Sequence, residues 1–364
     1  MNDKFEFSPC CLSSTVAKFS KENITHLISR TKTETGFDQL DAILGGGISP
    51  GLTVLGAVSG LGKSTLMLQI AEHISSEGTP VLFFSLEMSR DMIAAKAISR
   101  MYFQDIGCDE DFGLTANALT SVSDAKKLDK KLWETVDKVN IKSEKLYIIE
   151  RADVASKDKE QNVKLSAVRI KSIVADFIER QRDDEPKPVV IVDYLQILPP
   201  DNNPFAGSDK QQVDITVQHM TELAMAHNLP VVLVSSLNRT AYKAKVQYES
   251  LKESGGIEYS ADVILGLSFS AAPEEVNGSP KLDLKKEKAE FPRKVELSVL
   301  KQRYGGSGSE SVVQMDYYAK FDYFTQRDVK PSKKLKKQPY DKSQSKTRHS
   351  GWDNFSDAPE GKLK

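Results

Sequence analysis

The sequence is poor in cysteine and has no long hydrophobic run. Its three cysteines among 364 residues, Cys10, Cys11 and Cys108, provide neither a disulfide framework nor the paired spacing of a zinc site. No apolar run approaches the roughly 18 residues that a membrane span requires, and the acidic N-terminal residues do not match a signal peptide. These absences exclude a disulfide-stapled secreted scaffold and an integral membrane protein, and they predict a cytoplasmic location.

The chain also lacks an excess of charge of either sign. It carries 50 basic and 51 acidic residues, so its overall charge does not indicate a polyanionic partner. Residues 328–364 depart from this balance, with ten basic and five acidic side chains among Ser, Gln and Pro. Such a segment cannot bury enough apolar surface to fold, so we expect a disordered basic tail. Residues 1–34 are a polar leader whose few apolar residues recur at helical spacing, which predicts a short linker helix.

Residues 35–327 alternate short apolar runs with longer amphipathic ones. This pattern predicts an α/β domain with a mostly parallel sheet flanked by helices. Helices are expected at Ser64–Ser75 and Leu165–Arg180, and Val295–Leu300 with Ser311–Tyr317 should form a C-terminal β-hairpin. Six apolar runs are expected as buried parallel strands: Leu52–Leu55, Val81–Phe84, Leu146–Ile149, Val189–Val192, Val231–Val234 and Val263–Leu267.

The clearest motif is a strand, a glycine-rich loop and a helix over residues 52–65. The backbone N–H groups of such a loop converge on a phosphate, and the helix N-terminus adds partial positive charge. Lys63 would reach the β- and γ-phosphates, and the Ser64 hydroxyl would bind Mg²⁺. Ala57 replaces the first glycine of this Walker A pattern, and an alanine fits there if its φ is negative. The expected nucleotide-binding residues are Ala57, Gly60, Gly62, Lys63, Ser64 and Thr65.

A second nucleotide motif ends in Asp193, which follows the apolar run Val189–Val192. Mg²⁺ keeps several waters and needs only one or two protein oxygens, so Asp193 would hold its hydration shell. A strand-end aspartate alone would cap a turn equally well, but the phosphate loop favours the metal role. Tyr194 cannot serve as the base that hydrolysis needs. Glu87 is the best candidate, on a strand expected beside that of the phosphate loop; the alternative is a solvated glutamate opening the next helix.

Several motifs occur in one order along the chain: Thr35–Asp41, the phosphate loop, Phe84–Ser89, Ile191–Gln196, Lys252–Asp262 and Lys301–Gly305. Together they resemble the C-terminal motor domain of DnaB-type replicative helicases, over about residues 35–325. The resemblance implies a RecA-like P-loop NTPase fold with ATP and Mg²⁺ as cofactors. It also implies a homo-oligomer, a hexameric ring that travels 5′ to 3′ along single-stranded DNA.

The resemblance further implies roles for individual residues. Glu87 would be the catalytic base, and Arg303 with Lys301 would form the finger that reaches the nucleotide of a neighbouring subunit. Without that context, two cations in a hairpin would be ordinary surface charges. The loop 199–212 would line the DNA channel or be a flexible surface loop. The loop that tracks the phosphates of the DNA strand would contain Lys252, Glu253 and Gly255.

Three features depart from the family pattern. Ser236 stands where the family usually has a glutamine that senses the γ-phosphate, Ala272–Arg293 is a charged insertion, and the primase-docking N-terminal domain has no counterpart. In these respects the chain resembles the shortened helicases of mobile elements and phages. We therefore expect an ATP-dependent DNA helicase acting in replication, with primase or a loader as partner. The alternatives are a DNA-stimulated ATPase without unwinding activity, in recombination or element maintenance, and a loader that uses nucleotide only as a switch.

Overall fold

The computed structural model describes most of the chain between residues 32 and 327. The described residues are 16, 32–121, 129–154, 164–199, 208–237, 246–247, 250–251, 254–271, 274–276, 279–303 and 311–327. Most of the expected leader, the basic tail, the turn of the expected hairpin, and Lys252 and Glu253 lie outside them. No helix in these ranges is long and apolar enough to cross a lipid bilayer.

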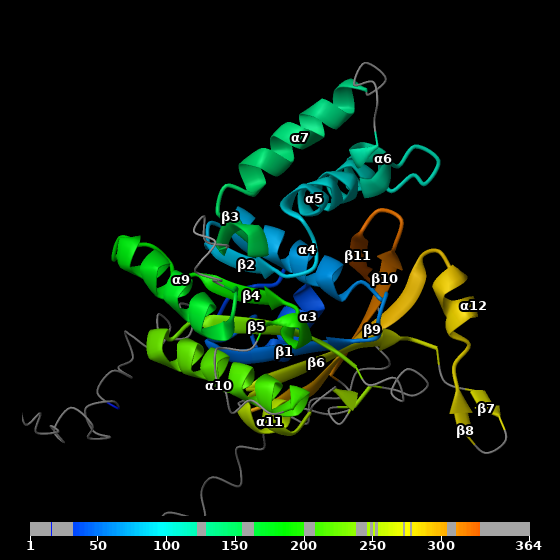
Figure 1. Ribbon diagram of the computed structural model, residues 1–364. Coiled ribbons are helices and arrows are strands. Elements are labelled where there is room, and N and C mark those ends of the chain that lie inside the picture. The colour runs from blue at the N-terminus through cyan, green and yellow to red at the C-terminus, as the bar shows by residue number, and fades with distance from the viewer. Residues whose placement is uncertain are drawn as a thin grey trace, which may run out of the picture. The chain divides into compact units, whose positions relative to one another are not determined.

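A nine-stranded sheet forms the centre of the described part, in the order β11-β10-β9-β6-β1-β5-β4-β2-β3 (Figure 1). The first six strands along the chain pair in parallel, and the last three continue the sheet in antiparallel fashion. The parallel strands are β1 (Gly51–Ala57), β2 (Val81–Ser85), β3 (Leu146–Glu150), β4 (Val189–Asp193), β5 (Pro230–Ser236) and β6 (Val263–Phe269). The antiparallel strands are β9 (Arg293–Gln302), β10 (Val312–Tyr318) and β11 (Tyr323–Gln326).

All six expected parallel strands are present, but they are not equally buried. β4 and β5 consist largely of Val, Ile and Leu, and they occupy central positions where both faces are covered. β3 lies at one edge of the sheet, and its Tyr147 is 44% exposed while packing edge-on against Phe177. An apolar run of this length therefore predicted the strand correctly and its burial incorrectly, because edge position is decided by strand order.

Strand order also overturns one expectation. β2, which precedes Glu87, was expected beside β1, yet β5 and β4 lie between them. β2 pairs instead with β4, in a register that places Ser85 opposite Asp193. The physical reason is that the connection through a helix carries the chain across the sheet, so strands that follow each other in sequence need not be neighbours.

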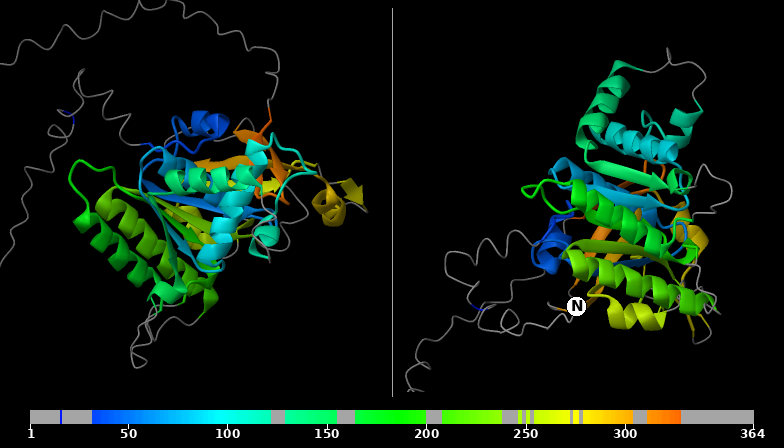
Figure 2. Two further views of the ribbon diagram at one scale, coloured as in Figure 1. Left: turned by 90° about the horizontal axis from the view of Figure 1, so that it is seen from above. Right: turned by 60° about the vertical axis from the view of Figure 1, so that its left-hand side comes forward.

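Helices cover both faces of the sheet (Figures 1 and 2). One face carries α4 (Lys63–Ser76) and α5 (Arg90–Asp105), with α7 (Lys130–Lys142) packed on them, and the other carries α9 (Ala167–Arg180), α10 (Asp209–His227) and α11 (Ser254–Ser260). Both expected helices, at Ser64–Ser75 and Leu165–Arg180, are confirmed. Shorter helical segments are α3 (Asp38–Leu44), α6 (Ala116–Thr120), α8 (Arg151–Val154), the 3₁₀ turn η3 (Leu195–Ile197) and α12 (Leu284–Ala289).

The loop expected over residues 199–212 is shorter than predicted. Ser208 caps α10, because its hydroxyl accepts a hydrogen bond from the Gln211 N–H at 3.3 Å. Residues 209–212 are therefore helical, and residues 200–207 lie outside the described residues.

The C-terminal hairpin is confirmed and has an additional strand. β9 and β10 pair antiparallel as expected, and β10 continues through a turn into β11. The pairing of β9 with β6 contains a bulge, since Leu265 lies opposite Val299 and Ile264 opposite Lys301, which leaves Leu300 as an extra residue. β11 escaped sequence analysis because its four residues are too short to show a period.

The charged insertion at Ala272–Arg293 contains its own secondary structure. β7 (Glu274–Val276) and β8 (Ser279–Lys281) form a separate two-stranded antiparallel sheet. α12 follows, and the Asp283 carboxylate caps it by accepting hydrogen bonds from the N–H groups of Lys285 and Lys286. The insertion leads directly into β9.

Candidate nucleotide-binding site

The phosphate loop connects β1 to α4 at the carboxyl end of the parallel strands. Gly60 and Gly62 have φ angles of 77° and 86°, a left-handed conformation that glycine adopts without penalty. Ala57 is the last residue of β1, is fully buried and does not have a positive φ, as its tolerance in this position requires. No described side chain caps α4, so its first N–H groups face the loop, and the loop with the helix N-terminus has the geometry of an anion site.

Asp193 lies at the end of β4, next to this loop. Its side chain is fully buried, and neither carboxylate oxygen has a partner in good hydrogen-bond geometry among the described residues. The pKa of Asp193 is raised to about 6: burial is the main cause and the Glu87 charge adds to it, whereas the nearby Ser64 hydroxyl and the Lys63 charge oppose it. A buried carboxylate without a well-placed donor is costly unless a cation completes it. The pair Ser64 and Asp193 therefore fits a hydrated Mg²⁺ ion, in the roles expected for both residues.

Lys63 is the first residue of α4, and its Nζ lies 4.9 Å from the centroid of the Tyr194 ring. This cation–π contact aims the ammonium toward the edge of the sheet where β4 ends. Burial raises the pKa of Tyr194, and the nearby Glu87 and Asp193 charges raise it further. Tyr194 is thus a neutral support for Lys63, a role that sequence analysis missed when it considered the residue only as a base.

Glu87 is exposed in the bend between β2 and α5, two residues before Ser89 caps that helix. The Leu86 N–H donates to the Asp193 carbonyl at 2.8 Å, which brings the Glu87 backbone beside the end of β4. Although β2 is not adjacent to β1, pairing with β4 places Glu87 at the same sheet edge as Asp193. Its role as catalytic base stays a prediction.

Ser236 ends β5, where the register with β1 places it opposite Ala57. Its N–H donates to the Gln196 Oε1 at 3.1 Å, and the Gln196 Nε2 donates to the Ser235 hydroxyl at 2.7 Å. The residue expected to sense the γ-phosphate therefore lies beside the start of the phosphate loop. The amide that adjoins it comes from Gln196, which sequence analysis did not assign.

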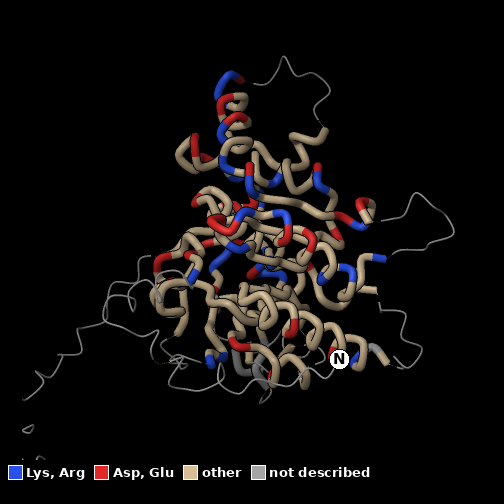
Figure 3. The backbone as a smooth tube through the Cα atoms, turned by 90° about the vertical axis from the view of Figure 1, so that its left-hand side faces the viewer, with Lys and Arg blue, Asp and Glu red and all other residues tan. Residues whose placement is uncertain are grey.

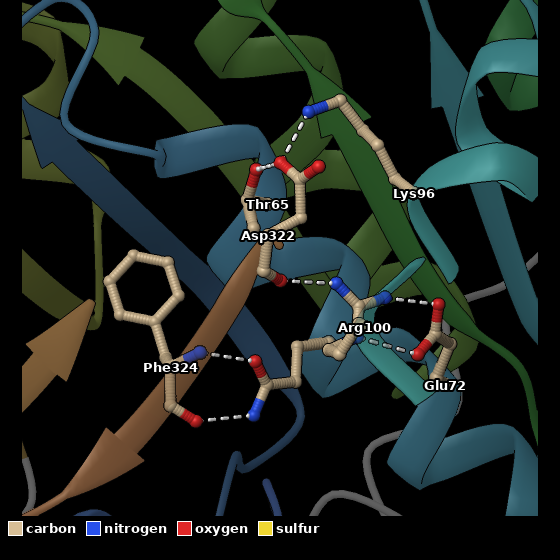
Figure 4. A network of polar contacts seen from close by, with 7 residues as sticks. Thr65, Glu72, Lys96, Arg100, Asp322 and Phe324 are labelled. Atoms are coloured by element: carbon tan, nitrogen blue, oxygen red, sulfur yellow. Dashed lines mark hydrogen bonds and ion pairs between the residues drawn. The ribbon is translucent and has the colours of Figure 1, made fainter. Parts of the chain in front are cut away.

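Thr65 was expected to bind the nucleotide, but its side chain points elsewhere. Its side chain is buried, and its hydroxyl donates to the Asp322 Oδ1 at 3.1 Å (Figure 4). Thr65 would consequently contact a phosphate through its backbone N–H, while its side chain is bound to the turn between β10 and β11.

Lys301 and Arg303 lie at the other end of the strands. In the antiparallel pairing, Lys301 lies opposite Ile264, three residues before Leu267, which pairs with Ala57. The Lys301 Nζ donates to the Glu258 carbonyl at 2.5 Å, and burial lowers the pKa of Lys301, with a further decrease from the Arg303 charge. These cations are therefore directed away from the phosphate loop of their own chain.

Arg303 is bound to the C-terminal end of α11. Its Nη2 donates to the Tyr259 carbonyl at 3.0 Å, and its Nη1 lies 3.1 Å from the Asp262 Oδ1. The Asp262 Oδ2 in turn accepts the Leu52 N–H at 2.9 Å, which ties this cluster to β1. Both finger candidates are thus held by the helix that follows the expected DNA loop.

Part of that expected DNA loop lies outside the described residues, since only Gly255 of its three candidates is placed. Gly255 lies in α11, and Lys210, an exposed residue at the start of α10, approaches it. The next residue, Gly256, packs so closely against Asp214 that a Cβ would lie 2.2 Å from the Asp214 carboxylate. Lys and Arg are interspersed with Asp and Glu over the side shown in Figure 3. Lys210 falls within the range 199–212 that was considered for the DNA channel, but nothing in the spacing linked it to Gly255.

Two elements distant in sequence support the phosphate loop from outside. From the insertion, the Lys288 Nζ donates to the Ser59 carbonyl at 3.2 Å, and from the start of β9 the Arg293 Nη1 donates to the Gly60 carbonyl at 3.3 Å. From β10, the Tyr317 ring packs against Gly62, where an added Cβ would lie 2.6 Å from the ring. The absence of a side chain at Gly62 is therefore required by packing as well as by φ. No group of three or more His, Cys, Asp or Glu side chains in the described ranges is arranged as a metal site.

Comparisons with known proteins show which family the chain matches. The profile of the family "DnaB-like helicase C terminal domain" matches residues 33–325. Replicative DNA helicase DnaB of Leifsonia xyli is 29% identical over 304 residues, which are 80% of this chain and 56% of that protein. Replicative DNA helicase DnaB of Helicobacter pylori J99 is 25% identical over 299 residues, which are 80% of this chain and 55% of that protein. The chain thus spans little more than half the length of these curated relatives.

Solved structures show the same fold. One of them, the structure of an ATPase domain, superimposes with a TM-score of 0.67 and 19% identity, covering 87% of this chain and 99% of that one. A DnaB-like replicative helicase described with its interactions with primase gives a TM-score of 0.64 and 18% identity, covering 89% and 67%. The fold is therefore RecA-like, and the region that matches the family contains every described site residue discussed above.

Proposed function

The chain belongs to the family of DnaB-like helicase C-terminal domains, and from this premise we propose that it hydrolyses ATP to move along single-stranded DNA and to separate duplex strands. The observation that carries the proposal is the buried Asp193 carboxylate, which has no described donor in good geometry and lies beside Ser64 and Lys63 at the phosphate loop. A triphosphate with its metal ion is the ligand that completes this arrangement.

The proposed cofactors are ATP and Mg²⁺. Ser64 and Asp193 would hold the ion, which when bound neutralises charge on the β- and γ-phosphates. Lys63 would contact the same phosphates, and Glu87, at the same sheet edge, would accept the proton of the attacking water.

The proposed working form is a ring of identical chains, a hexamer. Lys301 and Arg303 lie at the end of the sheet opposite to the phosphate loop, so they support hydrolysis only by reaching a neighbouring chain's nucleotide. Repetition around a ring would also multiply the few cations near Gly255 into a positive track for DNA. We place the activity in cytoplasmic DNA replication, with travel 5′ to 3′ and primase or a loader as partner.

Strand displacement on forked DNA tests the proposal. Wild-type protein with ATP and Mg²⁺ should release the labelled strand, whereas Glu87→Gln should bind the nucleotide and fail to unwind. An oligomeric preparation that hydrolyses ATP on DNA and never releases the strand would contradict helicase activity.

A second function is favoured by Ser236, which lacks the amide of the family's usual glutamine. It is a DNA-stimulated ATPase without unwinding activity, and the same assay distinguishes it by hydrolysis without strand release. A protein whose DNA-linked function survives Glu87→Gln would instead use the nucleotide as an assembly switch.

A further inference from the structure

The first turn of α4 rests on the turn that joins β10 to β11. Thr65, which directly follows Ser64, is 3% exposed and donates its hydroxyl to the Asp322 Oδ1 at 3.1 Å (Figure 4). The Tyr317 side chain also interacts with Thr65 while its ring packs against Gly62. Two residues of the phosphate loop and its helix are thus in contact with a part of the chain about 250 residues away.

Asp322 is held in place from three directions. It is 5% exposed, with a left-handed φ of 53° that its short polar side chain tolerates. The Lys96 Nζ lies 2.5 Å from its Oδ1, and the Arg100 Nη1 donates to its main-chain carbonyl at 2.8 Å. Arg100 itself is buried and paired with Glu72 of α4 (Figure 4). The Asp322 carboxylate therefore has little freedom to move away from Thr65.

We infer that Asp322 is a positioning residue for the nucleotide site: through Thr65 it fixes the backbone of Lys63 and Ser64 relative to the phosphates. This rests on the proposed function, because it presumes that ATP binds at the phosphate loop. Thr65 is one residue from the expected Mg²⁺ ligand, so a loss of its anchor is transmitted directly to the N–H groups that face the phosphates. The contact is also a buried one, and the Lys96 ammonium shares the same carboxylate oxygen.

A matched contact separates this role from ordinary packing. Gln69 lies four residues after Thr65 on α4 and docks the same helix onto β11. Its Oε1 accepts the Phe324 N–H at 2.9 Å, and its Nε2 donates to the Phe324 carbonyl at 2.8 Å. Removing Gln69 weakens the same interface without touching Thr65.

The test is equilibrium binding of a fluorescent ATP analogue with Mg²⁺ to the full-length chain. We expect Thr65→Val and Asp322→Gly each to weaken binding about tenfold, and the double variant to be no weaker than either alone. Glycine accepts the left-handed φ at position 322, so the turn itself is preserved. Thr65→Ser and Asp322→Asn, which keep a hydroxyl and an acceptor oxygen, should restore most of the affinity. Gln69→Leu should lower the thermal midpoint yet leave the affinity within about twofold.

Three results would overturn the role of Asp322. These are wild-type affinity in Thr65→Val, additive losses in the double variant, or an equal loss of affinity in Gln69→Leu. Should Asp322→Gly fail to fold, the contrast between Thr65→Val and Thr65→Ser decides alone. If wild-type protein binds the nucleotide no more tightly than Lys63→Ala does, the proposed function fails and this inference fails with it. If wild-type protein binds tightly and the Thr65 and Asp322 variants bind equally tightly, only this inference fails.

Discussion

The two ends of the parallel strands both carry cations with a proposed function, but in opposite conditions. At the carboxyl end, Lys63 lies over the Tyr194 ring beside an Asp193 carboxylate that has no described hydrogen-bond donor in good geometry. At the amino end, Lys301 and Arg303 are already bound to carbonyls of α11, and Arg303 is also paired with Asp262. The carboxyl end therefore has a buried carboxylate that lacks a well-placed partner, whereas the cations of the amino end form hydrogen bonds within the chain.

This difference indicates where each end obtains its partner. The carboxyl end is assembled from β1, β2, β4 and β5 of one chain, and under the proposed function a nucleotide with its metal ion would complete it. The amino end has no such requirement, so under the same proposal its cations would act only when a neighbouring chain offers charge that competes with α11. Four measurements break or sharpen this contrast.

The largest expected effect is at the carboxyl end. Lys63→Ala should abolish nucleotide binding and hydrolysis, because the ammonium is the principal positive charge facing the β- and γ-phosphates. Lys288→Ala is the matched control, since that lysine contacts the outer Ser59 carbonyl and its loss should have a small effect. Fluorescent-nucleotide titration measures both variants. Unchanged hydrolysis in Lys63→Ala would contradict the assignment of the phosphate loop.

The amino end should respond next. Arg303→Ala should lower hydrolysis by about 10³-fold in assembled protein, the usual range for a finger residue supplied by a neighbour. Each Arg303→Ala chain retains an intact phosphate loop, and each Lys63→Ala chain retains an intact Arg303. Mixing the two inactive variants should therefore restore hydrolysis in a steady-state assay. No recovery at any mixing ratio would contradict action between chains.

The pKa of Asp193 gives a prediction for stability without nucleotide. Its folded value of about 6 lies above the ordinary value of 3.8, so the folded state holds the proton more tightly. Between about pH 4 and pH 6 the free energy of unfolding should therefore fall as pH rises, by up to about 3 kcal/mol. Asp193→Asn should remove this loss and be more stable than wild type at pH 8, but not at pH 4. Urea denaturation at several pH values measures the difference. Glu179→Gln, which alters an exposed carboxylate near the end of α9, serves as control, and an unchanged pH profile in Asp193→Asn would contradict the assignment.

The smallest expected effect is on DNA affinity, and it concerns the basic residues of the segment 328–364, which belongs to neither end of the sheet. Deleting residues 328–364 removes ten basic and five acidic side chains. Affinity for a single-stranded oligonucleotide should fall about threefold at low salt, and the difference should vanish at high salt, because it arises from released counterions. Equal affinities at both salt concentrations would show that the tail does not contribute.

Sequence analysis predicted the carboxyl end well because its chemistry follows strand ends. Gly62, Lys63 and Ser64 belong to the loop and helix after one apolar run, and Asp193 ends another, so short spacing alone predicted that they lie close together. The parallel strands and the hairpin were likewise visible as apolar runs. Strand order was not visible in the sequence. Glu87 was therefore placed correctly at the carboxyl end of the sheet, but on a strand expected beside β1, whereas β2 pairs with β4.

Contacts between distant segments were beyond prediction. Tyr317, Asp322 and Arg293 reach the phosphate loop only after the antiparallel strands have joined the sheet. None carries a motif, and a Tyr or an Asp in a short strand or turn has many ordinary roles. The insertion was noticed for its charge, but its contact with Ser59 depends on a fold that no local pattern indicates.

The extra residue in β9 determines which way Lys301 points. Val295, Leu297 and Val299 alternate along one buried side of that strand, and uninterrupted alternation would have sent the odd-numbered Lys301 to the same side. Leu300 interrupts the alternation, so the Lys301 ammonium emerges toward the end of α11, where Arg303, just beyond the strand, also binds. A one-residue deletion there would turn the Lys301 charge inward without altering the residue that carries it.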